Sequence, residues 1–200
     1  MKSILISVKP KYSRLIEAGY KLEEIRKSVP KGFVGWVYLY ETLGKQKWVT
    51  DEKWSNEYPL WIGYEVFNNA YPPKRLIIEG RGKIIGRWWH DSYQTIPYEV
   101  TLPMGYESYD GEWVDNSEYG YWVNEAMLRK SCLTYEEISL YGNGKTLYAW
   151  KIDKFEKLDL YLSDFMTWNK GDKRTQDMNW IELKRPPQSW QYVYVKENKK

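Results

Sequence analysis

Short apolar runs recur along the whole chain and predict a protein built mainly from β-strands. Most of these runs are rich in β-branched and aromatic residues and are bounded by Gly, Pro, Asn or charged residues. We expect strands at residues 3–8, 21–27, 33–40, 76–79, 83–88, 146–152, 181–184 and 190–195. Helical spacing is clearest where Tyr12, Leu15 and Ile16 fall at positions i, i+3 and i+4. The pattern predicts an α+β fold in which sheet predominates.

Short helices are expected at residues 10–18, 124–130 and 134–141. Pro10 suits a first helical position, because its fixed φ and missing N–H cost nothing there. Gly19 suits the left-handed position that follows a last helical turn. Asn124 is a suitable N-cap, and Thr134 with Glu137 forms a capping-box pattern. Each expected helix therefore has a local signal at one or both of its ends.

A turn signal separates two neighbouring strands in the middle of the chain. Gly80-Arg81-Gly82 stands between the strand expected at residues 76–79 and the one expected at 83–88. We expect these two strands to pair with each other and to form the central hairpin of the sheet.

Two long segments, at about residues 43–74 and 103–123, interrupt the pattern and are expected to be insertions. Between Met104 and Trp122 the chain has five acidic residues, six aromatic residues and no basic residue. Because acidic groups repel phosphates, we expect this loop to lie away from any nucleic-acid face or to serve as a partner-binding or lid segment.

The chain is also unusually aromatic for its length. It contains 12 Trp, 19 Tyr and 4 Phe among 200 residues, and its formal net charge is +3. Tyr and Trp suit half-buried positions in sheets, and their ring faces also allow nucleic-acid bases to stack. The mild positive charge neither requires nor opposes binding of nucleic acid.

The counts of cysteine and histidine exclude several kinds of site. The single cysteine, Cys132, cannot form an intrachain disulfide and fits a reducing, cytoplasmic compartment. One cysteine and one histidine cannot build the usual zinc sites, and we expect neither a metal nor another cofactor. A Ser-His-Asp or Cys-His triad would need His90, which we instead expect to be a surface histidine at a strand end. No apolar run is long enough for a secretory signal or a membrane span.

Charged residues gather around the first expected helix. Lys9 and Lys11 stand at its N-terminus, where the helix dipole favours negative charge, so the pair suits an anion such as phosphate. After Gly19, the alternation of a strand places Glu24 and Arg26 on one face, where they can pair. Lys21 can join them only if it lies in a turn or bulge before regular strand pairing begins.

The eight residues from Gly19 to Arg26 read G-x-K-x-x-E-x-R. They resemble the signature of the ASCH domain, a branch of the PUA-like β-barrel superfamily associated with RNA. Residues 4–12 also look like the entry strand and helix of that family. Residues 147–150 and 185–190 resemble the closing strands of phage and bacterial ASCH-like proteins. The resemblance implies one PUA-like domain over residues 1–200, a mixed β-barrel flanked by short helices.

In the ASCH family the cleft at this motif is the expected ligand site, so the resemblance implies binding of RNA or a modified nucleotide. The residues expected to line the cleft are Lys9, Lys21, Glu24, Arg26 and Trp190. Cations would hold phosphate or a polar base edge, and the aromatic ring would contact an unstacked base.

Two alternatives stay open. ASCH relatives include amidohydrolases that deacylate N-acetylated cytidine and proteins described as ribonucleases, so Lys21 and Glu24 are candidate catalytic residues. Glu24 replaces the threonine of the amidohydrolase pattern, and its negative charge favours a charged Lys21 that holds an anion rather than attacks. The distal glutamate of that pattern would be Glu136 or Glu137. The second alternative is a phage accessory protein that binds a host protein through its aromatic insertions.

Overall fold

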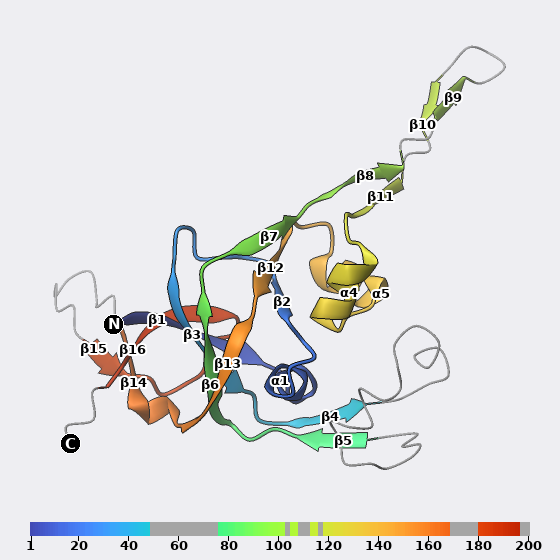
Figure 1. Ribbon diagram of the computed structural model, residues 1–200. Coiled ribbons are helices and arrows are strands. Elements are labelled where there is room, and N and C mark those ends of the chain that lie inside the picture. The colour runs from blue at the N-terminus through green and yellow to red at the C-terminus, as the bar shows by residue number, and fades with distance from the viewer. Residues whose placement is uncertain (49–75, 103–104, 108–112, 116–117, 169–179, 197–200) are drawn as a thin grey trace. The chain divides into compact units, whose positions relative to one another are not determined.

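The computed structural model describes residues 1–48, 76–102, 105–107, 113–115, 118–168 and 180–196 (Figure 1). The chain divides into two compact units. The first unit comprises Met1–Lys21, Phe33–Asp91 and Ile152–Lys200, and the second comprises Leu22–Gly32 and Ser92–Lys151. Each unit has its own sheets, and the expected single domain over the whole chain stays a prediction.

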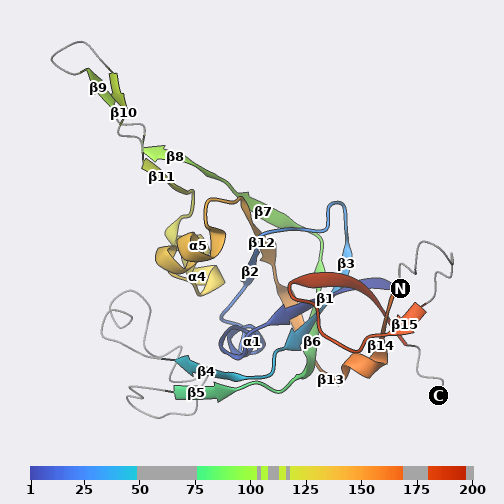
Figure 2. The same ribbon diagram turned by 180° about the vertical axis from the view of Figure 1, so that it is seen from behind.

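The first unit is built on a seven-stranded sheet in the order β13-β6-β3-β1-β16-β14-β15 (Figure 2). Its strands are β1 (Lys2–Val8), β3 (Gly35–Glu41), β6 (Lys83–His90), β13 (Asp153–Leu160), β14 (Phe165–Trp168), β15 (Trp180–Glu182) and β16 (Trp190–Val195). Strand β1 pairs in parallel with β3 and antiparallel with β16. The sheet is therefore mixed, as predicted, and the presence of short helices elsewhere in the chain makes the fold α+β.

One face of this sheet carries a core of large apolar side chains. Leu5, Tyr38 and Val193 alternate with residues that face the other way, as the period of two requires. The buried cluster on this face consists of Leu5, Tyr38, Tyr40, Ile84, Phe165, Leu183 and Val193, with Leu158 and Leu160 of edge strand β13 packed against it. Because β13 and β14 contribute to the same cluster, the sheet must curl. Full closure into a barrel stays a prediction.

The expected central hairpin is wrong. Strand β5 (Leu76–Glu79) pairs with β4 (Lys45–Trp48), whereas β6 pairs with β3 and β13. Residues 80–82 form a corner at which the ribbon passes from one sheet into another. A Cβ on Gly80 would lie 1.8 Å from the carbonyl oxygen of Thr42, so only glycine allows the two turns to approach this closely. Except for β4, the expected insertion at 43–74 lies almost wholly outside the described residues.

Helix α1 (Pro10–Glu17) follows β1 directly, with Pro10 at its first turn as predicted. Leu15 and Ile16 are buried, so the apolar stripe of the helix packs inward. Gly19 has a φ of +79°, the left-handed conformation expected after the last turn. This geometry ends the helix and starts the turn that contains Lys21.

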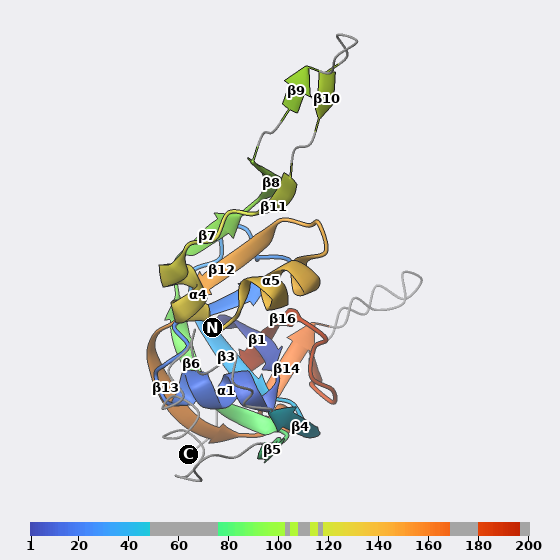
Figure 3. The ribbon, with the colours of Figure 1, turned by 90° about the vertical axis from the view of Figure 1, so that its right-hand side faces the viewer.

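The second unit contains a three-stranded sheet in the order β2-β12-β7, formed by Glu23–Arg26, Leu147–Lys151 and Tyr93–Ile96. Helices α4 (Glu125–Ser131) and α5 (Tyr135–Gly142) lie next to each other (Figure 3). Their predicted caps are present: the Asn124 side chain accepts from Met127 N–H at 2.9 Å, and Thr134 and Glu137 form the reciprocal capping box. The strands described within the insertion expected at 103–123 are β9 (Gly105–Glu107) and β10 (Trp113–Asp115), which pair with each other, and β11 (Glu118–Tyr121), which pairs with the preceding β8 (Tyr98–Leu102).

No helix in the described part of the chain combines the length and the apolar character that a membrane crossing requires.

Candidate functional site

Positive charge gathers at the start of helix α1 in the first unit. The N-cap residue is Lys9, which is exposed and makes no side-chain capping hydrogen bond. The first turn holds Pro10, Lys11, Tyr12 and Ser13 and therefore no acidic residue. An acidic residue in this turn would stabilise the helix, since the N-terminal end of the helix dipole is positive. The sequence instead has two lysines at this end, Lys9 and Lys11.

Two lysines near this helix end are buried, which is unusual for the residue type. The exposed fraction is 7% for Lys11 and 2% for Lys21. Their Nζ atoms lie 5.1 and 5.4 Å from the ring centroid of Tyr12, within cation–π range. Tyr12 therefore brings two ammonium groups to one ring. We call Lys9, Lys11 and Lys21 the lysine cluster.

The turn before Trp190 lies beside the end of β1 that leads into α1. The Ser7 hydroxyl donates to the carbonyl of Pro187 at 2.6 Å, and the Ser7 N–H donates to the carbonyl of Ser189 at 3.2 Å. Trp190 is half-buried and opposite Ile6 in the β1–β16 pair. Trp190 and Lys9, both predicted site residues, therefore belong to neighbouring chain segments of one unit.

Glu24 and Arg26 form the ion pair expected from strand alternation. Their Oε1 and Nη2 atoms are 3.0 Å apart on β2, and both residues are buried. Lys21 precedes β2 and its N–H donates to the carbonyl of Leu15, so it lies in a turn, as its expected role required. Lys21 belongs to the first unit and the ion pair to the second. The predicted convergence of all three in one cleft stays a prediction.

The two glutamates considered as a distal catalytic acid lie in the first turn of α5. The Glu137 carboxylate accepts from the Thr134 N–H at 3.0 Å and completes the capping box. Glu136 is exposed. The Glu137 carboxylate stabilises a helix end, and this structural role explains its position without a catalytic role.

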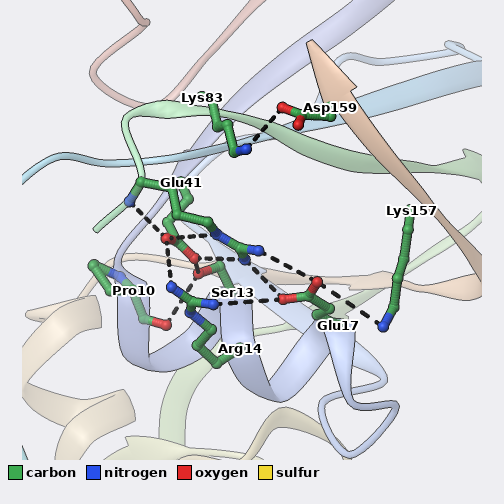
Figure 4. Close-up of polar contacts among 9 residues, drawn as sticks. Pro10, Ser13, Arg14, Glu17, Glu41, Lys83, Lys157 and Asp159 are labelled. Carbon is green, nitrogen blue, oxygen red and sulfur yellow. Dashed lines mark hydrogen bonds and ion pairs between the residues drawn. The ribbon is translucent and has the colours of Figure 1, made fainter. Parts of the chain in front are cut away.

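A dense polar network of the first unit surrounds Glu41 at the corner of the ribbon (Figure 4). Glu41 is fully buried at the end of β3. Its Oε1 accepts from the Arg81 N–H at 2.8 Å, from Arg81 Nε at 3.0 Å and from Arg14 at 3.3 Å. Its Oε2 accepts from Ser13 at 2.6 Å and from Arg81 Nη2 at 3.0 Å. Arg81 also reaches Glu17 at 2.7 Å.

This network holds the corner, β3 and α1 together and leaves the carboxylate fully satisfied. Burial alone would raise the pKa of Glu41, but the hydrogen bonds from Arg81 and Ser13 outweigh burial and lower it. Burial opposes the charge of Arg81 as well, and its bonds to Glu41 and Glu17 raise its pKa. A carboxylate held in its charged form by these donors suits a structural role better than proton transfer.

His90 ends strand β6 as predicted, but the prediction that it lies at the surface is wrong. Its exposed fraction is 1%, because the ring of Phe33 stacks on it with centroids 6.3 Å apart. Burial lowers the pKa of His90, and nearby Asp91 opposes this only in part. The residue is therefore neutral at pH 7 and belongs to the packing of the first unit.

No cluster of three or more His, Cys, Asp or Glu able to hold a metal ion is found in the described ranges of the chain. Binding without a metal stays a prediction.

Residue pattern alone identifies part of this arrangement. It predicts Lys9 and Lys11 at the helix start but does not predict the burial of Lys11. It assigns Tyr12 only to the apolar stripe, although its ring is what contacts both buried lysines. An aromatic residue directly after a lysine in the first turn of a helix is the signal that the sequence offers.

No protein-family model matches the chain, and no curated protein matches it. Two solved structures are similar to it. The crystal structure of ASCH from Zymomonas mobilis has a TM-score of 0.48 and 13% identity, covering 96% of this chain and 87% of that one. A tyrosine-to-phenylalanine mutant of that protein has a TM-score of 0.44 and 13% identity, covering 97% and 91%. Both are ASCH proteins, the family whose signature residues 19–26 resemble.

Proposed function

We propose that the first unit binds RNA, with the lysine cluster holding backbone phosphate. The observation that carries the proposal is the burial of Lys11 and Lys21 against one tyrosine ring at the N-terminus of a helix. Neighbouring positive charges repel each other more strongly as water is removed from around them. An anion that binds among them gains from each ammonium group at once, whatever other contacts each one makes.

The helix end adds to this attraction. The N–H groups of Tyr12 and Ser13 donate to the carbonyl of Lys9, and Pro10 has no N–H, so the helix end contributes its dipole, which favours negative charge at the N-terminus. Lys9, exposed at the N-cap, can approach a ligand from solvent without any rearrangement of the fold. The site thus has buried cations that fix an anion and an exposed cation that attracts it.

Aromatic neighbours favour a nucleotide over free phosphate. Tyr12 and Trp190 are both half-buried, so each ring keeps some surface for contact with a base. Single-stranded RNA is bound by proteins through this combination of aromatic faces and cations. The mild net charge of the whole chain does not oppose it, since local charge decides phosphate contact.

We expect Lys11→Met and Lys21→Met each to weaken binding of a twelve-nucleotide oligouridylate about fivefold to tenfold at roughly 0.1 M salt. Methionine keeps an unbranched apolar side chain and removes the charge, which limits the disturbance of packing. The slope of log affinity against log salt should fall by about 0.7 for each phosphate of a single strand that the variant no longer neutralises. Fluorescence anisotropy across a salt series measures both quantities.

Lys157→Met is the matched control. Lys157 is exposed on β13, and its ammonium lies 4.0 Å from Glu17, which is in the last turn of α1 and not in the first. Replacing Lys157 by methionine changes the net charge by the same amount as replacing Lys11 or Lys21. A thermal melt of each variant verifies folding. If folded Lys11→Met and Lys21→Met bind as Lys157→Met does, the lysine cluster is not the phosphate site.

A further inference from the structure

Five aromatic side chains share one face of the seven-stranded sheet. Trp190, Tyr192 and Tyr194 alternate along β16 and therefore face the same side. Tyr194 pairs with Met166, two residues before Trp168, and Trp168 pairs with Trp180. Paired residues lie on the same side of a sheet, so all five rings belong together. We call Trp168, Trp180, Trp190, Tyr192 and Tyr194 the aromatic face.

These rings contact one another across the strands. Trp180 and Tyr194 have centroids 4.1 Å apart, and Trp168 and Trp180 are 4.8 Å apart. Trp190 and Tyr192 are 5.6 Å apart, and every one of these three pairs has a tilted or edge-on geometry. In each edge-on contact the edge of one ring covers one face of its neighbour, so these pairs fix the rings without a parallel stack between them.

The aromatic face is accessible to solvent. Trp168 and Trp180 keep 41% and 40% of their surface exposed, and the three residues of β16 are half-buried. Trp88 and Phe165 of the same unit are by contrast fully buried. Exposed apolar surface that is contiguous in this way marks an interaction site.

The charge on this face suits a polyanion. The Lys2 ammonium lies 3.7 Å from the ring centroid of Tyr192. Glu182 shares this side of the sheet, since it pairs with Met166, and its carboxylate is 2.7 Å from Lys196. The acid is therefore neutralised by a partner, while Lys2 lies over one face of the Tyr192 ring and adds positive charge there.

One end of the aromatic face adjoins the lysine cluster. Trp190 is paired with Ile6, and β1 runs on from Ile6 to the N-cap Lys9. Trp190 to Tyr194 spans about 13 Å along the strand, at roughly 3.3 Å per residue. A strand of nucleic acid anchored by phosphate at the cluster would meet aromatic surface along the direction of β16.

We infer that the aromatic face stacks the bases of a single-stranded nucleic acid whose phosphate is held at the lysine cluster. The inference deepens the proposed function and rests on it for the anchor. Lysine is depleted in protein–protein interfaces, whereas aromatic rings near lysines are what sequence-tolerant binding of single strands uses. The occupant is therefore a run of unpaired bases with little sequence preference.

Two ligands of equal charge separate stacking from phosphate contact. We compare twelve-nucleotide oligouridylate with an abasic ribose-phosphate of twelve units, using the full chain and fluorescence anisotropy. Trp180→Leu is expected to weaken oligouridylate binding about tenfold, the value of one base–aromatic stack, and to leave abasic binding unchanged. Lys21→Met is expected to weaken both ligands.

Trp89→Leu is the matched control. Trp89 is 40% exposed like Trp180 and also makes an edge contact, with Trp36 at 5.3 Å, but it lies on the other face of the same sheet. Equal effects of Trp180→Leu and Trp89→Leu, or equal affinity of the wild type for both ligands, would overturn the inference. So would a dimer that Trp180→Leu dissociates while RNA affinity stays constant.

The two proposals fail differently in this design. If Lys21→Met leaves both ligands unaffected while Trp180→Leu selectively weakens oligouridylate, the aromatic face stands and the phosphate anchor is elsewhere. If Lys21→Met weakens both ligands and Trp180→Leu weakens neither, the lysine cluster stands and base stacking on this face is refuted.

Discussion

Replacing Glu41 by alanine is expected to destabilise the first unit by about 3 kcal/mol. Removing one member of a buried ion pair costs about 3–5 kcal/mol, because the other charge is left without compensation. The lower end applies here, since Arg81 is partly exposed and keeps its contact with Glu17. Removal of the carboxylate also leaves the buried Ser13 hydroxyl without that acceptor. For a chain of this size the melting temperature should fall by roughly 6–12 °C.

The Glu41 carboxylate should also make the free energy of unfolding depend on pH in the acidic range. The folded pKa of Glu41 is below its ordinary value of 4.5, so its contribution is fully present above that pH and is lost as pH falls through the folded pKa. Urea unfolding measured between about pH 3 and 7 should therefore show a steeper acid loss in the wild type than in Glu41→Gln.

Glu79→Ala is the control for Glu41. Glu79 also forms a short ion pair, 2.7 Å from Lys45, but both side chains are about two-thirds or more exposed. Exposed pairs contribute little to stability, because water and salt screen the two charges. If Glu41→Ala and Glu79→Ala melt at the same temperature, the network in Figure 4 does not hold the corner.

Phe165→Ala is expected to destabilise the first unit by about 3–5 kcal/mol, the range for deleting a buried phenyl ring. Phe165 is fully buried, and its ring meets Tyr38 edge-on with centroids 5.0 Å apart. The change leaves a cavity between β14 and β3, which are not adjacent in the sheet and meet only because it curls. Urea unfolding followed by tryptophan fluorescence measures the loss of stability.

Phe165→Leu separates volume from aromatic character. It keeps much of the apolar volume and should cost less than about 1.5 kcal/mol. A Phe165→Ala variant as stable as the wild type would mean that β14 is not part of the core formed by β1, β3 and β6.

Local patterns in the sequence predict most individual elements of this structure. Pro10 and Gly19 mark the two ends of α1 through their own backbone conformation, and Asn124 and Thr134 mark the starts of α4 and α5 through hydrogen bonds to near neighbours. The central hairpin fails for the opposite reason. Whether β5 pairs with β4 or β6 depends on Glu41 and Thr42, which lie almost forty residues away from the corner they contact.

In the candidate site, too, local features could be predicted from the sequence and features that depend on tertiary packing could not. The Glu24–Arg26 pair follows from strand alternation alone, which needs no knowledge of tertiary structure. The burial of Lys11 and His90 cannot be predicted in this way, because it depends on how Tyr12 and Phe33 pack around them. Charge is visible in a sequence, but the removal of water from around that charge is a property of the fold.

The corner at Glu41 and Arg81 also makes the protein a convenient scaffold for grafting. Beyond it, the chain leaves along β4 and returns along β5, and Trp48 pairs with Leu76. Paired strands are about 4.8 Å apart, so the two attachment points are already at the spacing of a hairpin. A peptide epitope or a reporter domain whose own ends lie close together therefore matches the spacing between Trp48 and Leu76, and the corner next to these strands is held separately by the bonds from Arg81 to Glu41.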